Sequence, residues 1–158
     1  MCVVMTGLGI TQRNWWPYAF GPAALLLVYG YFRYGAIQLA FQAHLRGRDA
    51  DVARFLRQTK YPDLLRPSDR AYFEFLHGML AAAKGEHATA RAHLEQAAKG
   101  PLRTDNMRSV ICCHLAAIAI AEGDKESAAS QLEQARSIPH QKGTDAMIVK
   151  LEEALAEA

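Results

Sequence analysis

The chain has 158 residues, a length that suits one domain of ordinary size. Its composition, 51% hydrophobic and 22% charged with 11 Gly and 6 Pro, excludes a disordered chain, a collagen-like repeat and a low-complexity linker. The net charge of +2 does not favour nucleic acid as a partner, although basic residues outnumber acids by eight to four over residues 33–70.

The first elements in the chain are a tail and an apolar segment. Residues 1–13 form the tail, to which the sequence assigns no function. Residues 14–32 carry no charge. A helix of that length, at about 1.5 Å per residue, nearly crosses a hydrocarbon layer of about 30 Å. The sequence predicts a transmembrane helix over residues 14–32, with a helical pattern that continues to about residue 46. The side chains predicted to lie at the membrane interfaces are Trp15, Trp16, Tyr18, Tyr31 and Arg33.

Two other interpretations of this segment are a cleaved signal peptide and a buried core helix. The first lacks a small-residue cleavage site, and the second is usually shorter. Arg13 alone precedes the segment, whereas several Arg follow it, so the positive-inside rule predicts a single-pass membrane protein with a cytoplasmic C-terminal domain. The adjacent Cys112 and Cys113 are poorly placed for a disulfide framework, which agrees with a reducing compartment.

Residues 33–143 contain an internal repeat with a period of 38 residues. Gly47, Gly85 and Gly123 follow this spacing, and so do two further series: Leu56, Leu94 and Leu132, then Gln58, Gln96 and Gln134. Each unit reads as a helix, a glycine turn and a second helix, with the glycine in the left-handed conformation that ends the first helix. Residues 144–158 predict a last amphipathic helix that caps the stack. The predicted fold is therefore all-α.

The repeat resembles the tetratricopeptide repeat. The positions that carry the resemblance are Gly78, Gly85, Ala90, Leu94 and Ala97 in the second unit, and Ala116, Gly123, Ala128, Leu132 and Ala135 in the third. The first unit matches less well, with Ala40, Gly47, Val52 and Leu56, and Thr59 replaces its final Ala. The family period is about 34 residues. We therefore expect the extra residues to lie in the connections between units, near Pro62, Pro67 and Pro101.

The resemblance implies that the first helix of each unit lines a concave face that binds extended or helical peptides. The predicted partner-binding residues on this face are Tyr34, Ile37, Phe41, Tyr72, Phe75, Met79 and Cys113. The Lys, Arg and Asn clamp of the chaperone-binding members is missing, so the face favours a hydrophobic peptide or the apolar side of an amphipathic helix. The alternative is that these side chains pack against one another, against the capping helix or against a second copy.

Few residues suggest a catalytic or metal-binding site. Cys112, Cys113 and His114 project about 100° apart on a helix and cannot converge on one metal ion. Glu74 and His77 lie at i, i+3, where an internal hydrogen bond is favoured over a proton-handling site, and His87 and His93 are expected to face solvent. The sequence carries no phosphate-binding loop or hydrolase motif, so it predicts no enzyme, no cofactor and no metal site.

These features together predict a membrane-anchored adaptor that binds a protein partner through the apolar face of its repeats and also contacts membrane lipid. The alternative is an accessory subunit of a larger membrane complex, in which the transmembrane helix packs laterally and the repeats cover a cytoplasmic surface. The sequence nominates neither the partner nor the process.

Overall fold

The computed structural model describes residues 22–30 and 36–157. Residues 22–30 are helical, and no strand occurs in the described part of the chain. The later elements, in chain order, are α3 (Ile37–Leu45), α4 (Asp49–Gln58), the short 3₁₀ helix η1 (Pro62–Leu64), α5 (Pro67–Ala83), α6 (His87–Lys99), α7 (Asp105–Glu122), α8 (Lys125–Ser137) and α9 (Lys142–Glu157).

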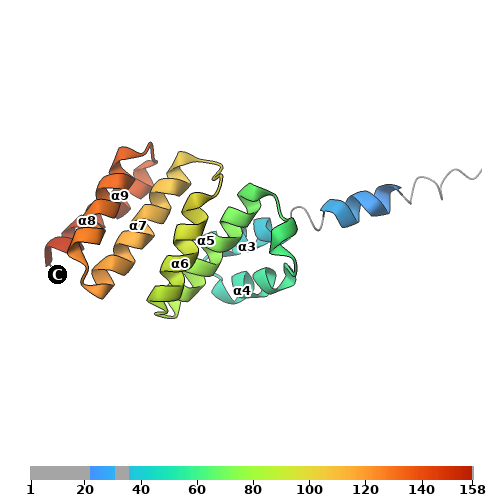
Figure 1. The fold of residues 1–158 in the computed structure, drawn as a ribbon, viewed down its shortest axis with the longest axis horizontal. Helices are drawn as coiled ribbons and strands as arrows, with labels where there is room; N and C mark the ends of the chain where they lie inside the picture. Colours follow the sequence, from blue (N-terminus) through green and yellow to red (C-terminus); the bar gives the residue numbers. More distant parts are fainter. Residues whose placement is uncertain (1–21, 31–35, 158) are drawn as a thin grey trace, which may run out of the picture.

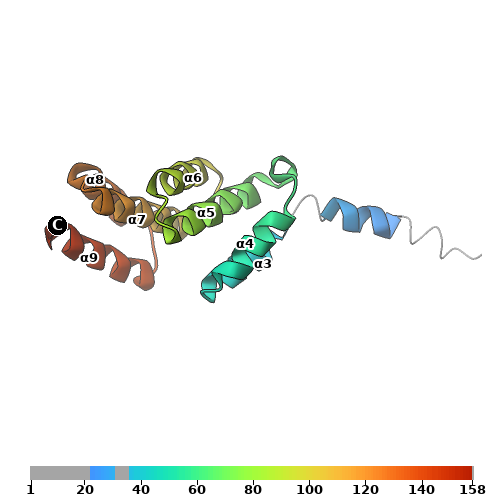
Figure 2. The same cartoon turned by 90° about the horizontal axis from the view of Figure 1, so that it is seen from below.

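The helices form three successive hairpins, α3–α4, α5–α6 and α7–α8, which follow one another along the molecule (Figure 1). In Figure 2 the α3–α4 hairpin and α9 both lie on the lower side of the middle helices, so the row of helices is bent. The last helix, α9, packs against α7 and α8 and caps the row. The predicted helical repeat is therefore confirmed. The capping helix begins at Lys142, slightly earlier than expected, so Thr144 lies inside the helix and its hydroxyl donates to Asn106 Oδ1 at 2.9 Å.

The hairpin turns have the predicted geometry. Gly47, Gly85 and Gly123 have φ values of 67°, 77° and 77°, in the left-handed region where a side chain would be strained. Each second helix begins two residues after its glycine. In the third turn the carboxylate of Asp124 caps α8 by accepting the Ser127 N–H at 3.0 Å. The 38-residue period therefore repeats a backbone geometry as well as a residue type.

The repeat positions form the core, because small residues let the two helices of a hairpin approach. The side chains at these positions are buried: Ala40, Val52 and Leu56 in the first hairpin, Ala90, Leu94 and Ala97 in the second, and Ala116, Ala128, Leu132 and Ala135 in the third. Gly78 is the tightest of these positions, since a Cβ there would lie 2.8 Å from Leu94 Cγ. The core therefore depends on small residues at fixed spacing.

Helix α7 contributes to two hydrophobic clusters. Met107, Ile111 and Leu115 pack with residues of α3 to α6, whereas Cys112 and Cys113 pack with residues of α8 and α9. Because side chains four residues apart share one face of a helix, the two sets point in different directions. This double burial accounts for the apolar sequence of α7 and makes it the element that joins the C-terminal hairpin to the rest.

The predicted transmembrane helix is not found, and this prediction is wrong for the described residues. No helix within residues 22–30 and 36–157 has both the length and the apolar character needed to cross a membrane. The described stretch 22–30 would span only about 14 Å. The separate helix α3 begins at Ile37, with Ala36 as its N-cap. The prediction counted charge-free residues as one helix, although Pro22 and Gly30 within the run are poor helix-interior residues.

Several predicted residues lie outside the described part of the chain. They are the partner-binding residue Tyr34 and the five membrane-interface residues Trp15, Trp16, Tyr18, Tyr31 and Arg33. Within residues 22–30, the apolar side chains from Leu25 to Tyr29 are between 52% and 76% exposed.

Candidate functional site

A row of aromatic and imidazole rings connects the first helices of the three hairpins. Phe41 of α3 meets Tyr72 of α5 edge-on, with ring centroids 5.3 Å apart. One turn further along, His44 meets Phe75 at 5.7 Å, and Phe75 meets His114 of α7 at 6.1 Å. Edge-to-face packing of this kind stabilises a contact beyond the area it buries. Phe75 therefore lies between neighbours from both adjacent hairpins.

The two histidines of this row are held in their neutral form. Burial lowers the pKa of His114 to about 4, and the nearby His44 acts in the same direction. Burial also lowers the pKa of His44, against the opposing charge of Asp49. Desolvation disfavours the charged imidazolium, so at neutral pH both rings pack as uncharged groups. The part of the row formed by His44, Phe75 and His114 is therefore uncharged at neutral pH.

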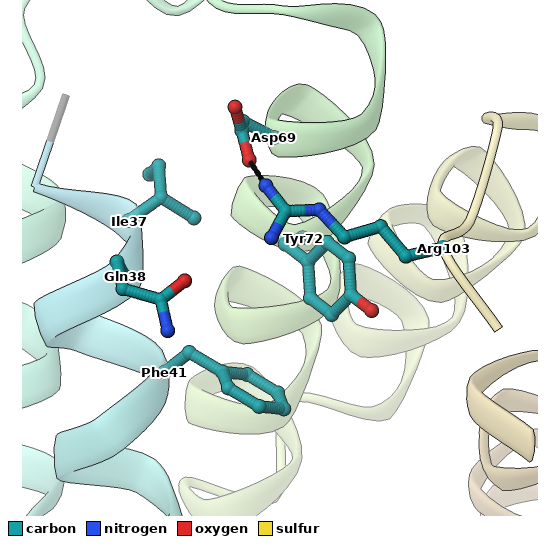
Figure 3. Close-up of a pocket in the computed structure, with 6 residues that line it drawn as sticks. All are labelled: Ile37, Gln38, Phe41, Asp69, Tyr72 and Arg103. Atoms are coloured by element: carbon teal, nitrogen blue, oxygen red, sulfur yellow. Dashed lines mark hydrogen bonds and ion pairs between the residues drawn. The ribbon is translucent and has the colours of Figure 1, made fainter. Parts of the chain in front are cut away.

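A pocket of about 110 Å³ opens at the other end of this row. Its lining comes from α3, from the N-terminal part of α5 and from the connection before α7: Ile37, Gln38, Phe41, Asp69, Tyr72 and Arg103. Figure 3 shows the Gln38 and Phe41 side chains on the α3 side and Tyr72, Asp69 and Arg103 on the other. We call these six residues the inner-face pocket.

An ion pair borders the inner-face pocket. Asp69, which is only 5% exposed, pairs through Oδ1 with the guanidinium of Arg103, which also lies 5.6 Å from the centroid of the Tyr72 ring. The second carboxylate oxygen, Asp69 Oδ2, is buried and has no hydrogen-bond partner in the described structure. An unsatisfied buried oxygen is costly, and this one is closed off from solvent.

Local sequence places these groups. Pro67 occupies the first turn of α5, where its missing N–H is tolerated, and Asp69 lies in the same turn near the positive end of the helix dipole. Thr104 caps α7 by accepting the Met107 N–H at 3.3 Å, which positions the adjacent Arg103. Burial raises the pKa of Tyr72, against the opposing charge of Arg103, so its phenol stays protonated.

The predicted partner-binding residues that the structure describes lie in two environments. Ile37, Phe75 and Cys113 are buried, at 2%, 1% and 0% exposure. Phe41, Tyr72 and Met79 are half-buried and present part of their surface. Only Ile37, Phe41 and Tyr72 of the predicted set line the inner-face pocket.

Cys113 lies apart from this surface. It belongs to the cluster that packs α7 against α8 and α9, with Cys112 and Ile148 among its members. Burial raises the pKa of the Cys113 thiol to about 11. The thiol is protonated at neutral pH, and its side chain packs as a small apolar group.

Sequence reasoning missed three residues of the pocket, namely Gln38, Asp69 and Arg103. Asp69 and Arg103 are 34 residues apart in the chain, and neither belongs to the repeat signature. Asp69 gave one usable signal, because an acid in the first turn of a helix that follows Pro is typical of a helix start. Its burial depends on α3 and on the connection before α7, which local patterns do not reveal.

The predicted Glu74–His77 pair is replaced by a different arrangement. Glu74 Oε2 lies 2.8 Å from Nδ1 of His93, and His77 stacks on the His93 ring at 5.4 Å. His93 is 35% exposed rather than fully solvent-facing, because α6 turns this side toward α5. Burial lowers the pKa of His77, as do the neighbouring His93 and Lys84, while Glu74 acts in the opposite direction. This cluster ties α5 to α6 within one hairpin.

Residues 22–30 and 36–157 contain no group of three or more His, Cys, Asp or Glu side chains placed to hold a metal ion. Comparison with known proteins finds no matching family model, no matching curated protein and no matching solved structure.

Proposed function

We propose that this protein is a tetratricopeptide-like adaptor that binds a peptide segment of a partner protein at its inner-face pocket. The observation that carries the proposal is the pocket itself. It combines apolar walls from Ile37, Phe41 and Tyr72 with the Asp69–Arg103 ion pair and the exposed side chain of Gln38. Peptide sites commonly join an apolar recess with a few well-placed polar groups.

The dimensions of the pocket suit a single side chain. Its volume of about 110 Å³ is smaller than the roughly 150 Å³ cavity that accommodates benzene in an engineered protein core. An aliphatic side chain of the partner would enter between Phe41 and Tyr72. The exposed amide of Gln38 would bond to an adjacent peptide group of the partner backbone.

Gln38 is the best position at which to test this site. Its side chain is exposed and lines the pocket, so Gln38→Trp fills the entrance without disturbing the core. Phe75 is unsuitable because it is 1% exposed, and its substitution would report on folding. Gln42, which is exposed on the same helix but does not line the pocket, provides the matched control Gln42→Trp.

The experiment is a purification of the tagged full chain under native conditions, followed by mass spectrometry. We expect proteins that co-purify with the unmodified chain and with Gln42→Trp to be lost with Gln38→Trp. Circular dichroism confirms that all three chains are folded. If Gln38→Trp retains the same partners as the control, the inner-face pocket is not the binding site.

The same purification distinguishes an exchangeable adaptor from a fixed accessory subunit. An adaptor exchanges its partner when excess unlabelled chain is added. A subunit co-migrates in constant stoichiometry and does not exchange. We propose the adaptor because the pocket is small and open, whereas permanent subunit interfaces are large and apolar.

A further inference from the structure

A second groove lies between α4 and α6, with α5 as its floor. Its volume is about 320 Å³. The side chains that line it come from all three helices and from the turn before α6: Ala53, Leu56, Arg57, His77, Leu80, Ala81, Lys84, Glu86, Thr89 and His93. We call it the outer groove. It shares no lining residue with the inner-face pocket.

The outer groove has an apolar floor and a donor-rich rim. Leu56 of α4 and Leu80 and Ala81 of α5 supply the apolar surface, while Arg57 of α4 and Lys84, the C-cap residue of α5, belong to the rim. Neither of these two cations forms an ion pair with a described residue. Glu86 is the one carboxylate among the lining residues, so the two cations outnumber it. The groove therefore carries an uncompensated positive charge beside apolar surface.

The repeat supplies an internal comparison for this groove. The residues that lie 38 positions after Ala53 and Lys84 are Arg91 and Glu122. Arg91 and Glu122 form an ion pair that links α6 to α7 at the second junction. At the first junction Ala53 is too short to reach across, and Lys84 has the opposite sign to Glu122. The ion pair of the second junction is therefore missing from the first, and a cation stands where the acid would be.

We propose that the outer groove binds an acidic peptide segment of a partner protein. The partner's carboxylate would lie between Arg57 and Lys84. An aliphatic side chain next to that carboxylate would cover Leu56 and Leu80. Charge complementarity of this kind gives specificity and faster association. This site is independent of the inner-face pocket, so either proposal can fail without the other.

The test is fluorescence anisotropy of the full chain with a labelled probe, the blocked hexapeptide Leu-Glu-Glu-Leu-Glu-Glu, at low ionic strength. A second probe has Gln in place of every Glu. We expect the acidic probe to bind at least about tenfold more tightly than the Gln probe. Lys84→Glu should weaken binding of the acidic probe by about tenfold, because it reverses the charge at the rim. Equal binding of the two probes would overturn the proposal.

Two further variants separate site-specific binding from general charge attraction. Arg54→Glu makes the same charge change on an exposed residue of α4 that does not line the groove, so it should weaken binding far less than Lys84→Glu. The double variant Ala53→Arg/Lys84→Glu installs the pair found at the second junction, and it should close the groove and abolish binding while the chain stays folded. Equal losses of binding with Arg54→Glu and Lys84→Glu would overturn the proposal. Displacement of the acidic probe by inorganic phosphate alone would overturn it as well.

Discussion

The two junctions between hairpins use the same backbone frame and differ in the charges at their edges. At the second junction, Met107, Ile111 and Leu115 of α7 pack into the core, the Arg91–Glu122 pair joins α6 to α7, and a groove of about 370 Å³ lies between α6, α7 and α8. At the first junction, rings of α3 and α5 make the contact, and the cations of the outer groove form no ion pair with a described residue. Repeated small residues therefore set the spacing of the helices, while the side chains between them decide which charges are paired.

Phe75 offers the strongest test of this difference, because it contacts rings on both sides. Phe75→Ala removes a buried aromatic side chain and leaves a cavity, so we expect it to lower the free energy of unfolding by about 3–5 kcal/mol. Urea denaturation followed by circular dichroism measures the loss. Met79→Ala, at a half-buried position on the same helix, should cost clearly less. A loss below about 1 kcal/mol for Phe75→Ala would show that the ring row does not hold the hairpins together.

Acid should weaken the ring row through His114. The pKa of this buried imidazole is lowered to about 4 in the folded chain, below the ordinary 6.5 that it has when unfolded. Between pH 6.5 and pH 4 the unfolded chain therefore binds the proton first, and the free energy of unfolding falls by about 3 kcal/mol. Urea denaturation at pH 7 and pH 4.5 measures the change. His114→Phe should remove most of this pH dependence. If the variant loses as much free energy of unfolding between pH 7 and pH 4.5 as the unmodified chain, other groups cause the dependence.

Gly78 distinguishes the second hairpin from its neighbours. The equivalent positions in the first and third hairpins hold Ala40 and Ala116, both fully buried. A Cβ at Gly78 would lie 2.8 Å from Leu94 Cγ and 3.2 Å from the Ala90 carbonyl oxygen. We expect Gly78→Ala to cost about 1–3 kcal/mol in spite of its better helix propensity, because the core must shift. Thermal unfolding measures the cost, and a stabilised variant would show that Leu94 moves aside freely.

The Arg91–Glu122 pair should contribute little to stability and more to the shape of the surface. Both side chains are about one-third exposed, at 30% and 35%, so Arg91→Ala should cost at most about 1 kcal/mol. The triple variant Arg91→Ala/Glu95→Arg/Glu122→Lys copies Ala53, Arg57 and Lys84 of the first junction and should create a second site for the acidic probe. Titration would then give two sites per chain. An unchanged stoichiometry would mean that these three residues alone do not make a binding site.

The sequence predicted the repeat because its signals are local and recur. Glycines with positive φ and small residues at helix contacts are required wherever two helices turn and pack closely, so Gly47, Gly85 and Gly123 marked three turns correctly. The transmembrane prediction failed because it used the length of the uncharged run and the residues at its ends. The number of charge-free residues does not say whether one continuous helix contains them, and the structure begins α3 at Ile37 as a separate element.

The inner-face pocket was predicted only in part. Ile37, Phe41 and Tyr72 follow from the repeat register, which places them on the first helices. Asp69 lies in the first turn of α5 and Arg103 in the connection before α7, and their meeting depends on how the second and third hairpins are oriented. Likewise, the partner of Glu74 is His93 on the next helix rather than His77 on its own helix. Residue spacing along one helix does not show which side chain of the neighbouring helix lies closest.

The amino-acid order was enough to determine the helices, their period and the glycine turns, because backbone conformation and helix contact depend on residues a few positions apart. The packed chain alone established which charges meet. Arg91 and Glu122 join, Lys84 is left without an acid, and one oxygen of Asp69 has no donor. Electrostatic pairing depends on distances between side chains far apart in the chain, and folding fixes those distances.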